Sequence, residues 1–387
     1  MKVGIIGGGI AGLTCGYKLA QRKINSIIFE KEPVIGGRLQ YNMGAIGSEE
    51  VYKNTADLIR ELGLEILKTP LSPTLMGALA GNRVIGTEEF KKTLESLTKE
   101  EISYYQELTN FIFSLSFDLR NPSPKLKELR KISFAEYIKG CPERIKKLCI
   151  DPRMNFTFEP DYKKIAADFA LFTLRHEANL LLGKAYIFEE GLLPLTNVLT
   201  KKIKDLKGQI LISTEVKKVE KKAGGFEVYY VKNGDEKKEL VDQVVFATPL
   251  FITQELFPQL NLKTNIEYKE IKCIFVEGRL KYGQKLITGL KEMDRSNILG
   301  FSAIFPYGQI VIPFDNKKAV DFKTLYKKYR VILEKKLKAG WPVIPPNSEV
   351  PELKTKTEGI FLCGDFYFYP SIETAVTTAG IVVGMIG

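Results

Sequence analysis

The chain has 387 residues, of which 44% are hydrophobic and 27% charged, a balance that excludes disordered, collagenous and coiled-coil proteins. At about 150 residues per domain, this length predicts two or three domains. Lys and Arg number 57 against 46 Asp and Glu, and the net charge of +11 favours an anionic partner, whether nucleic acid, an acidic membrane surface or an acidic substrate.

The N-terminus predicts a nucleotide-binding unit. Lys2–Ile6 and Ile24–Phe29 are short apolar runs, and Ala11–Gln21 between them has the pattern of a helix. Two strands joined by a helix within about 30 residues indicate a parallel sheet. Glycines interrupt the apolar start and no small-residue cleavage site follows, so we interpret it as folded structure rather than a signal peptide.

The rest of the chain changes character along its length. The stretch 87–179 is helical and poor in strands, with breaks predicted at Asn121-Pro122 and Asp151-Pro152. From 209 to 247 the apolar period becomes two, and an Asn233-Gly234 turn indicates a hairpin between its strands. We expect the N-terminal unit, this hairpin and a buried strand at Gly359–Cys363 to form one nucleotide-binding sheet. Further strands are predicted at Ile271–Leu280, Ile298–Phe305 and Gln309–Phe314, a helix at Tyr52–Leu62 and another at the C-terminus, and solvated helix faces at Lys91–Glu101 and Lys323–Lys338.

Several classes of site and location are disfavoured. The only histidine, His176, cannot make a histidine-rich metal site or readily a serine–histidine hydrolase, and we interpret it as a surface or core residue. The cysteines are odd in number and without a C-x-x-C pair, which suits a reducing cytosol; they are Cys15, Cys141, Cys149, Cys273 and Cys363. No apolar run reaches about 18 residues, so we predict a cytoplasmic protein without a spanning helix, leaving open contact with a membrane surface.

A glycine motif is the strongest signal of chemistry. Gly7 to Gly12 matches G-x-G-x-x-G between a predicted strand and helix, with Ile10 and Ala11 at the helix start. In this motif Gly7 makes the tight turn, Gly9 lets the backbone approach a pyrophosphate, and Gly12 lets the helix pack on the strand. Glu30 ends the second predicted strand, where its carboxylate can bind the hydroxyls of an adenosine ribose. An adenine dinucleotide is therefore expected, and the motif alone suits NAD and FAD equally.

A second motif bears on the choice between NAD and FAD, through its resemblance to a known family. Gly36-Gly37-Arg38 follows Glu30 and Lys31, and the stretch from Gly4 to Leu39 resembles the N-terminus of the flavin amine oxidase superfamily. That superfamily includes monoamine and polyamine oxidases, protoporphyrinogen oxidases and phytoene desaturases. The resemblance implies FAD, with the second glycine pair and Arg38 near the pyrophosphate and flavin edge.

Three later segments resemble the same family in the same order. Val216 matches the strand residue whose backbone meets the adenine, and Ala247-Thr248 matches a strand ending in Ala-Thr-Pro. Gly364-Asp365 resembles the closing motif, in which the aspartate binds the ribityl chain. Ile372 and Glu373 begin the last predicted helix. The resemblance implies that the N-terminus of this helix points at the flavin. A helix N-terminus favours the negative charge of reduced flavin.

Lys272 and the residues near Ser371 bear on the subfamily. Lys272 lies in an apolar strand and resembles the amine oxidase lysine that holds a water against flavin N5, although a solvent-facing lysine fits the strand alternation equally well. Ser371 stands where amine oxidases place one of two aromatic rings, and the stretch Phe366–Tyr369 offers substitutes. No cysteine occupies the family's covalent-attachment position, so we expect FAD to be bound non-covalently. We expect no metal to be bound.

The sequence thus predicts an α/β two-domain flavoprotein with a Rossmann-like FAD-binding domain and a mixed-sheet plus helical substrate domain. The first would comprise 1–70, 190–250 and 345–387, and the second 71–189 and 251–344. The resemblance implies an oxidoreductase that transfers a hydride from a substrate C–H to flavin N5, with Lys272 as the candidate catalytic residue. The substrate is a small molecule and not a nucleic acid: an amine, or a hydrophobic porphyrinogen or polyprenoid. A flavin-binding protein without redox turnover, or an isomerase, remains a further alternative, and the oligomeric state is left open.

Overall fold

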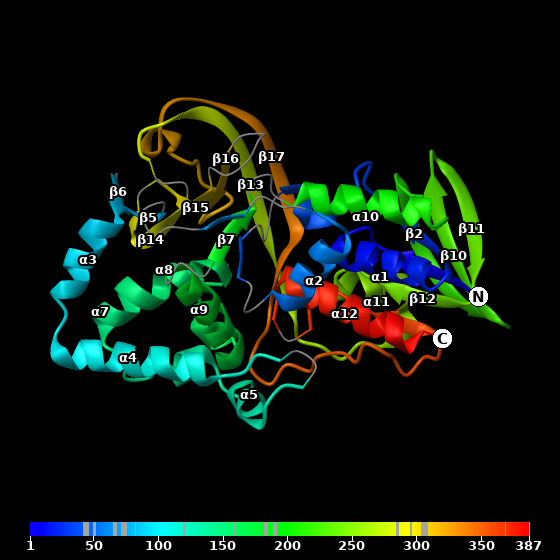
Figure 1. Cartoon of the computed structure of the whole chain (residues 1–387), viewed down its shortest axis with the longest axis horizontal. Helices are drawn as coiled ribbons and strands as arrows, with labels where there is room; N and C mark the ends of the chain where they lie inside the picture. The colour runs from blue at the N-terminus through cyan, green and yellow to red at the C-terminus, as the bar shows by residue number, and fades with distance from the viewer. Residues whose placement is uncertain are drawn as a thin grey trace.

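A computed structural model gives the fold. It describes residues 1–41, 46–48, 52–64, 68–70, 76–81, 83–118, 121–157, 159–181, 185–188, 192–283, 286–294, 296–302, 309–367 and 369–386. Figure 1 shows two parts: one built around α1, α10 and α12, and one in which a helical block lies below an arched sheet. No helix within the described ranges is long and apolar enough to cross a membrane.

The first part is organised by a parallel sheet in the order β18-β12-β1-β2-β8. Its strands are β1 (Lys2–Ile6), β2 (Asn25–Phe29), β8 (Gln209–Leu211), β12 (Gln243–Phe246) and β18 (Ile360–Leu362). β1 is central, with Ile5 opposite Ile28 on one side and Val245 on the other. Its residues Val3 and Ile5 are fully buried, as expected for a parallel sheet covered on both faces. The predicted N-terminal and C-terminal strands therefore share one sheet.

Helices pack around this sheet. They are α1 (Ile10–Gln21), α2 (Lys53–Glu61), α10 (Leu193–Asp205), α11 (Leu250–Leu256) and α12 (Ile372–Met385). α1 lies between α10 and α12, and α2 packs on α12 (Figure 1). This arrangement brings the N-termini of the first and last long helices of the chain into one layer.

The predicted hairpin exists but belongs to a separate sheet. β9 (Thr214–Lys222), β10 (Gly225–Lys232) and β11 (Asp235–Val241) form an antiparallel sheet of their own. Asn233 and Gly234 both have positive φ, 54° and 86°, as the tight hairpin turn requires. The expectation of a single sheet was therefore wrong. The third strand of the separate sheet, β11, could not be recognised from sequence, because it is polar and mostly exposed and lacks the alternation that marks a half-buried strand.

The second part contains a seven-stranded sheet in the order β17-β13-β16-β15-β14-β5-β6. The strands are β5 (Met76–Gly81), β6 (Arg83–Gly86), β13 (Glu267–Leu280), β14 (Leu286–Asp294), β15 (Ile298–Ser302), β16 (Gln309–Pro313) and β17 (Tyr326–Val343). The helix predicted at Lys323–Lys338 is wrong, since most of that stretch lies in β17. Lys and Glu favour helix locally, but pairing along almost the whole of β13 overrides that preference.

The helical block is confirmed. Its helices are α3 (Thr87–Glu95), α4 (Lys99–Ser114), α5 (Pro124–Leu129), α6 (Phe134–Tyr137), α7 (Glu143–Ile145), α8 (Asp151–Met154) and α9 (Ala167–Leu181). The break at Asn121-Pro122 falls between α4 and α5, and Asp151-Pro152 begins α8 directly after a π-helical turn at Lys146–Ile150. Inside the block, Asp168 of α9 is 1% exposed and pairs with Arg130, Oδ2 to Nη2 at 2.6 Å.

The two parts share a small sheet. β3 (Ile46–Ser48) and β4 (Lys68–Pro70) both pair with β7 (Ala185–Phe188). All strands of the parallel sheet come from the segments predicted for the nucleotide-binding domain. In the small sheet, β3 and β4 also come from those segments, but β7, which pairs with both, comes from the segment predicted for the substrate domain. The domain boundaries themselves stay a prediction.

Candidate cofactor and active site

The glycines of the first motif differ in why they are needed. Gly7 has φ +105°, and a Cβ there would lie 2.7 Å from the carbonyl oxygen of Ala247. A Cβ on Gly12 would lie 2.0 Å from the carbonyl oxygen of Gly7. Both glycines are therefore required by the protein's own packing. Gly9 has an ordinary φ of −72°, and a Cβ there would meet nothing within 4 Å. The open space beside Gly9 fits a ligand that approaches the backbone closely.

The start of α1 adjoins this space. Gly9 is the N-cap residue and provides no side-chain cap, and the first turn, beginning at Ile10 and Ala11, contains no acidic residue. The first N–H groups of a helix have no partner within it and carry the positive end of its dipole. An anion such as a pyrophosphate would satisfy them.

The Glu30 carboxylate joins the glycine loop to the segment that follows β2. Its Oε2 accepts a hydrogen bond from the N–H of Gly8 at 2.7 Å, and its Oε1 accepts one from Glu32 at 2.9 Å. Burial raises the pKa of Glu30, and these two N–H donors partly oppose that rise. Each carboxylate oxygen can accept more than one hydrogen bond, so both oxygens retain acceptor capacity for ribose hydroxyls.

The predicted adenine strand begins beside Glu30. The N–H of Thr214 donates to the Glu30 carbonyl oxygen at 2.8 Å, and Val216 follows two residues later, largely buried in β9. Lys31, also predicted to contact the cofactor, is exposed next to Glu30. The structure thus places the start of β9 beside Glu30, and contact of Val216 with an adenine stays a prediction.

The second glycine pair folds against the first. The N–H of Gly36 donates to the Gly8 carbonyl oxygen at 2.9 Å. Gly37 has φ +54°, and a Cβ there would lie 3.2 Å from the Cα of Gly9. The two glycine motifs therefore form one continuous surface. Arg38 follows directly after the second motif.

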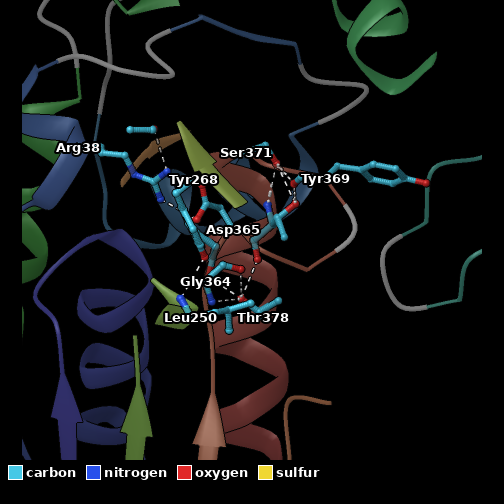
Figure 2. A network of polar contacts seen from close by, with 11 residues as sticks. Arg38, Leu250, Tyr268, Gly364, Asp365, Tyr369, Ser371 and Thr378 are labelled. Carbon is cyan, nitrogen blue, oxygen red and sulfur yellow. Dashed lines mark hydrogen bonds and ion pairs between the residues drawn. The ribbon is translucent and has the colours of Figure 1, made fainter. Parts of the chain in front are cut away.

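Arg38 reaches the closing motif. Its Nη2 lies 2.6 Å from Oδ1 of Asp365, and its Nη1 donates to the carbonyl oxygen of Gly340 at 3.2 Å. Tyr268 is part of the same cluster and accepts a hydrogen bond from the N–H of Leu250 at 3.2 Å (Figure 2). Burial and the nearby Asp365 carboxylate raise the pKa of the Tyr268 phenol, so it is neutral at physiological pH. Tyr268 and Gly340 carry no motif, and the sequence did not indicate them.

The closing motif is anchored on α12. The N–H of Gly364 donates to the hydroxyl of Thr378 at 3.0 Å, and Ser371 caps the helix by accepting from the N–H of Thr374 at 3.0 Å (Figure 2). The helix then begins at Ile372. Asp365 and the N-terminus of α12 are thereby held next to each other.

Glu373 joins α12 to α2. Its two carboxylate oxygens accept hydrogen bonds at 2.8 Å from the N–H groups of Asn54 and Thr55, in the first turn of α2. The α2 N-cap residue, Tyr52, makes no side-chain cap, so Glu373 caps α2 from another helix. Its side chain is committed to joining α12 to α2, and a contact with the cofactor stays a prediction.

Ala247 and Thr248 pack against the glycine loop. The N–H of Ala247 donates to the Ile6 carbonyl oxygen at 2.9 Å, continuing the β1–β12 pairing. The Thr248 hydroxyl lies 2.9 Å from that of Thr253 in α11. Both residues lie against Gly7 of the glycine loop, and their contact with the cofactor stays a prediction.

Lys272 is ion-paired across the sheet. Its Nζ lies 2.7 Å from Oε2 of Glu334 on β17, and its side chain is 16% exposed. Lys269, three residues earlier, pairs with the buried Glu159. Glu334 was not recognised from sequence, because no local pattern relates residues 62 positions apart. Contact of Lys272 with a flavin stays a prediction.

Tyr369 is not an open ring beside the site. It is 1% exposed and stacks on Phe172, with ring centroids 4.5 Å apart and an interplanar angle of 7°. In Figure 2 its ring points away from Arg38 and Asp365. Phe366 is also buried, Tyr367 is half-buried, and Phe368 lies outside the described residues. The predicted substitution of aromatic rings is therefore not supported for Tyr369.

His176 is half-buried on α9 and contacts Tyr52, with ring centroids 5.5 Å apart. Burial lowers its pKa to about 4. The unfolded chain binds a proton here below about pH 6.5, whereas the folded protein does not until about pH 4, so stability is lost as the pH falls through this window. Between pH 7 and 5 we expect a loss of at most about 2 kcal/mol, reduced in His176→Gln. Urea titrations of both proteins at the two pH values test this; equal losses would contradict it.

We also predict that Glu30→Ala weakens FAD binding by about tenfold or more, since a hydrogen bond to a charged group contributes about 1.5–3 kcal/mol. Glu30→Gln keeps one acceptor oxygen and should lose less affinity. Fluorescence titration of the apoprotein with FAD measures both, with Glu95→Gln on the exposed side of α3 as the control. An unchanged dissociation constant in Glu30→Ala would exclude it as a ribose ligand.

Comparisons with known proteins agree with this geometry. The family model described as flavin containing amine oxidoreductase matches residues 10–281. The structure is similar to a CLA-producing fatty acid isomerase from P. acnes, with a TM-score of 0.72 and 14% identity, covering 100% of this chain and 98% of that one. It is also similar to cyclohexylamine oxidase from Brevibacterium oxydans IH-35A, with a TM-score of 0.69 and 15% identity, covering 100% and 99%. An oxidoreductase from Methanosarcina mazei gives 0.69 and 14%, covering 99% and 100%.

At these identities the similar structures show the fold alone, and they confirm the predicted two-domain α/β architecture over the whole chain. The search of curated proteins found no match.

Proposed function

Because this chain belongs to the family of flavin containing amine oxidoreductases, we propose that it removes a hydride from a substrate C–H bond with FAD held non-covalently. The family makes it an FAD-dependent oxidoreductase. When bound, FAD supplies the hydride acceptor, its flavin ring. Hydride transfer to this ring needs little acid–base catalysis by the protein. A chain with a single histidine can therefore perform it.

The space beside Gly9 is the observation that carries the cofactor assignment. The start of α1 would bind the pyrophosphate and Glu30 the ribose. The Arg38–Asp365 pair and the N-terminus of α12 would bind the ribityl chain and the flavin edge. Non-covalent binding is supported by the cysteines: Cys15, Cys149, Cys273 and Cys363 are buried, and Cys141 is half-buried in the helical block.

We propose an amine as the first candidate substrate, on the strength of Lys272. Two observations favour a second candidate, dehydrogenation of a C–C or C–N bond in a hydrophobic molecule such as a porphyrinogen or polyprenoid. Ser371 is a helix cap rather than an aromatic ring, and Tyr369 is enclosed by Phe172 and Phe117. The net charge of +11 also disfavours a cationic substrate at long range.

Three measurements test the proposal. The purified protein should be yellow and should release intact FAD on acid denaturation; colour that stays with the precipitate would contradict non-covalent binding. Anaerobic photoreduction followed by dioxygen then tests redox activity. Flavin that cannot be reduced would favour a binding protein, and the similarity to a fatty acid isomerase makes an unsaturated fatty acid a necessary member of the substrate panel. In that anaerobic panel, bleaching by amines supports the first candidate, and bleaching by a porphyrinogen or polyprenoid supports the second.

A further inference from the structure

The outer edge of the seven-stranded sheet carries an unusual surface. β17 is an edge strand, hydrogen-bonded to β13 and to no other strand of the sheet among the described residues. Its residues 327–334 are all exposed. Figure 1 shows β13 and β17 as a long ribbon arching away from the nucleotide-binding part. A long exposed edge normally carries polar side chains that keep other molecules away.

Apolar side chains are concentrated on this edge. Tyr329 is 39% exposed, Val331 38%, Ile332 47% and Leu333 50%. The other large exposed hydrophobic residues of the described chain are scattered along it, between Met1 and Met385. Isolated exposed apolar residues are ordinary, but a contiguous group indicates an interaction site.

A β-bulge lies within this group of apolar residues. Phe275 of β13 pairs with Leu333 and the next residue, Val276, pairs with Val331, so Ile332 has no opposite residue. A bulge re-aims side chains and interrupts the regular alternation of faces. Because Phe275 and Val276 point to opposite faces of the sheet, Leu333 lies on the Phe275 face and Tyr329 and Val331 lie on the Val276 face. The exposed apolar side chains therefore border the β17 edge on both faces of the sheet.

Cations flank the apolar residues on both sides. Between residues 327 and 338 the only acidic residue is Glu334, and the basic residues are Lys327, Lys328, Arg330, Lys335, Lys336 and Lys338. Glu334 pairs with Lys272, Arg330 with Glu277 and Lys335 with Glu32. Within the described part of the chain, Lys327 and Lys328 have no ion-pair partner. We call Tyr329, Val331, Ile332, Leu333 and these six basic residues the β17 patch.

We propose that the β17 patch docks on a membrane surface rich in anionic lipid. Apolar side chains can enter the boundary between headgroups and acyl chains while lysine and arginine extend their charges to the phosphates. Tyrosine is suited to that boundary because its ring is apolar and its hydroxyl polar. A second copy of the chain fits less well, because pairing two β17 edges would bring two cationic stretches together and the bulge interrupts the ladder.

Vesicle co-sedimentation of the holoenzyme tests this. Binding is expected to vesicles of phosphatidylserine mixed with phosphatidylcholine, to weaken with salt, and to be nearly absent with phosphatidylcholine alone. Lys327→Glu combined with Lys328→Glu should lower the partition coefficient at least about thirtyfold, or about fivefold per cation. Ile332→Ser should lower it as well, at unchanged activity in solution.

Matched variants serve as controls. Lys201→Glu with Lys204→Glu, exposed on α10, makes the same change in net charge, and Leu240→Ser removes another exposed leucine. Equal losses in these controls, or no binding of the wild-type protein to the anionic vesicles, would overturn the proposal. So would a dimer in light scattering that Ile332→Ser dissociates, or binding to polyglutamate without binding to vesicles. Thermal melting confirms that each variant is folded.

Discussion

Reduced holoenzyme carrying Lys272→Met should react with dioxygen about 10²–10³ times more slowly than the wild type, with FAD binding and fold retained. This expectation rests on the proposed place of Lys272 at the flavin, where a fixed positive charge would stabilise developing negative charge; removing such a group costs about 2.7–4 kcal/mol. Stopped-flow mixing of photoreduced protein with dioxygen at equal FAD occupancy measures the rate.

The ion pair with Glu334 provides the control that the sequence alone did not suggest. Glu334→Gln keeps the ammonium of Lys272 but removes its partner 2.7 Å away, so the rate should change less than in Lys272→Met. Lys336→Met removes an exposed lysine directly opposite Lys272 on β17 and should leave the rate unchanged. If Lys272→Met also matches the wild type, Lys272 serves only its ion pair, and the amine substrate loses its main support in favour of the hydrophobic one.

The second large effect concerns Gly9. Gly9→Ala should weaken FAD binding by about 10–100-fold, because a methyl group forced into a filled space typically costs about 1–3 kcal/mol. The apoprotein should melt at the wild-type temperature, since the backbone of Gly9 is ordinary and its Cβ would meet nothing within 4 Å. Isothermal titration of apoprotein with FAD and thermal melting without FAD separate the two effects.

Gly12→Ala is the matched comparison. Its Cβ would lie 2.0 Å from the Gly7 carbonyl oxygen, so the apoprotein itself should be destabilised along with FAD binding. If Gly9→Ala bound FAD as tightly as the wild type, the space beside Gly9 would not be the pyrophosphate site. If it destabilised the apoprotein as much as Gly12→Ala, Gly9 would be a packing glycine as well.

Local sequence was sufficient for the elements that a local residue pattern marks. Lys2–Ile6 was predicted as a strand with its exact bounds, and the helix predicted from Ala11 begins one residue earlier. Here the strand–glycine–helix pattern and continuous burial point to one structure. The Asn233-Gly234 turn was equally readable because its backbone conformation favours those residue types.

What only the tertiary structure decided depends on partners far apart in the chain. A Lys- and Glu-rich stretch became β17 because β13 pairs with it, and Glu373 became a cap for α2 because α12 brings it there. The Lys272–Glu334 and Arg38–Gly340 contacts likewise join residues that no local pattern connects. The sequence by itself determined the dinucleotide motif, because backbone geometry at a phosphate site constrains residue type, and the choice of FAD over NAD rested on the family resemblance. Which side chains surround that site was determined by long-range packing, whose energy outweighs local preference.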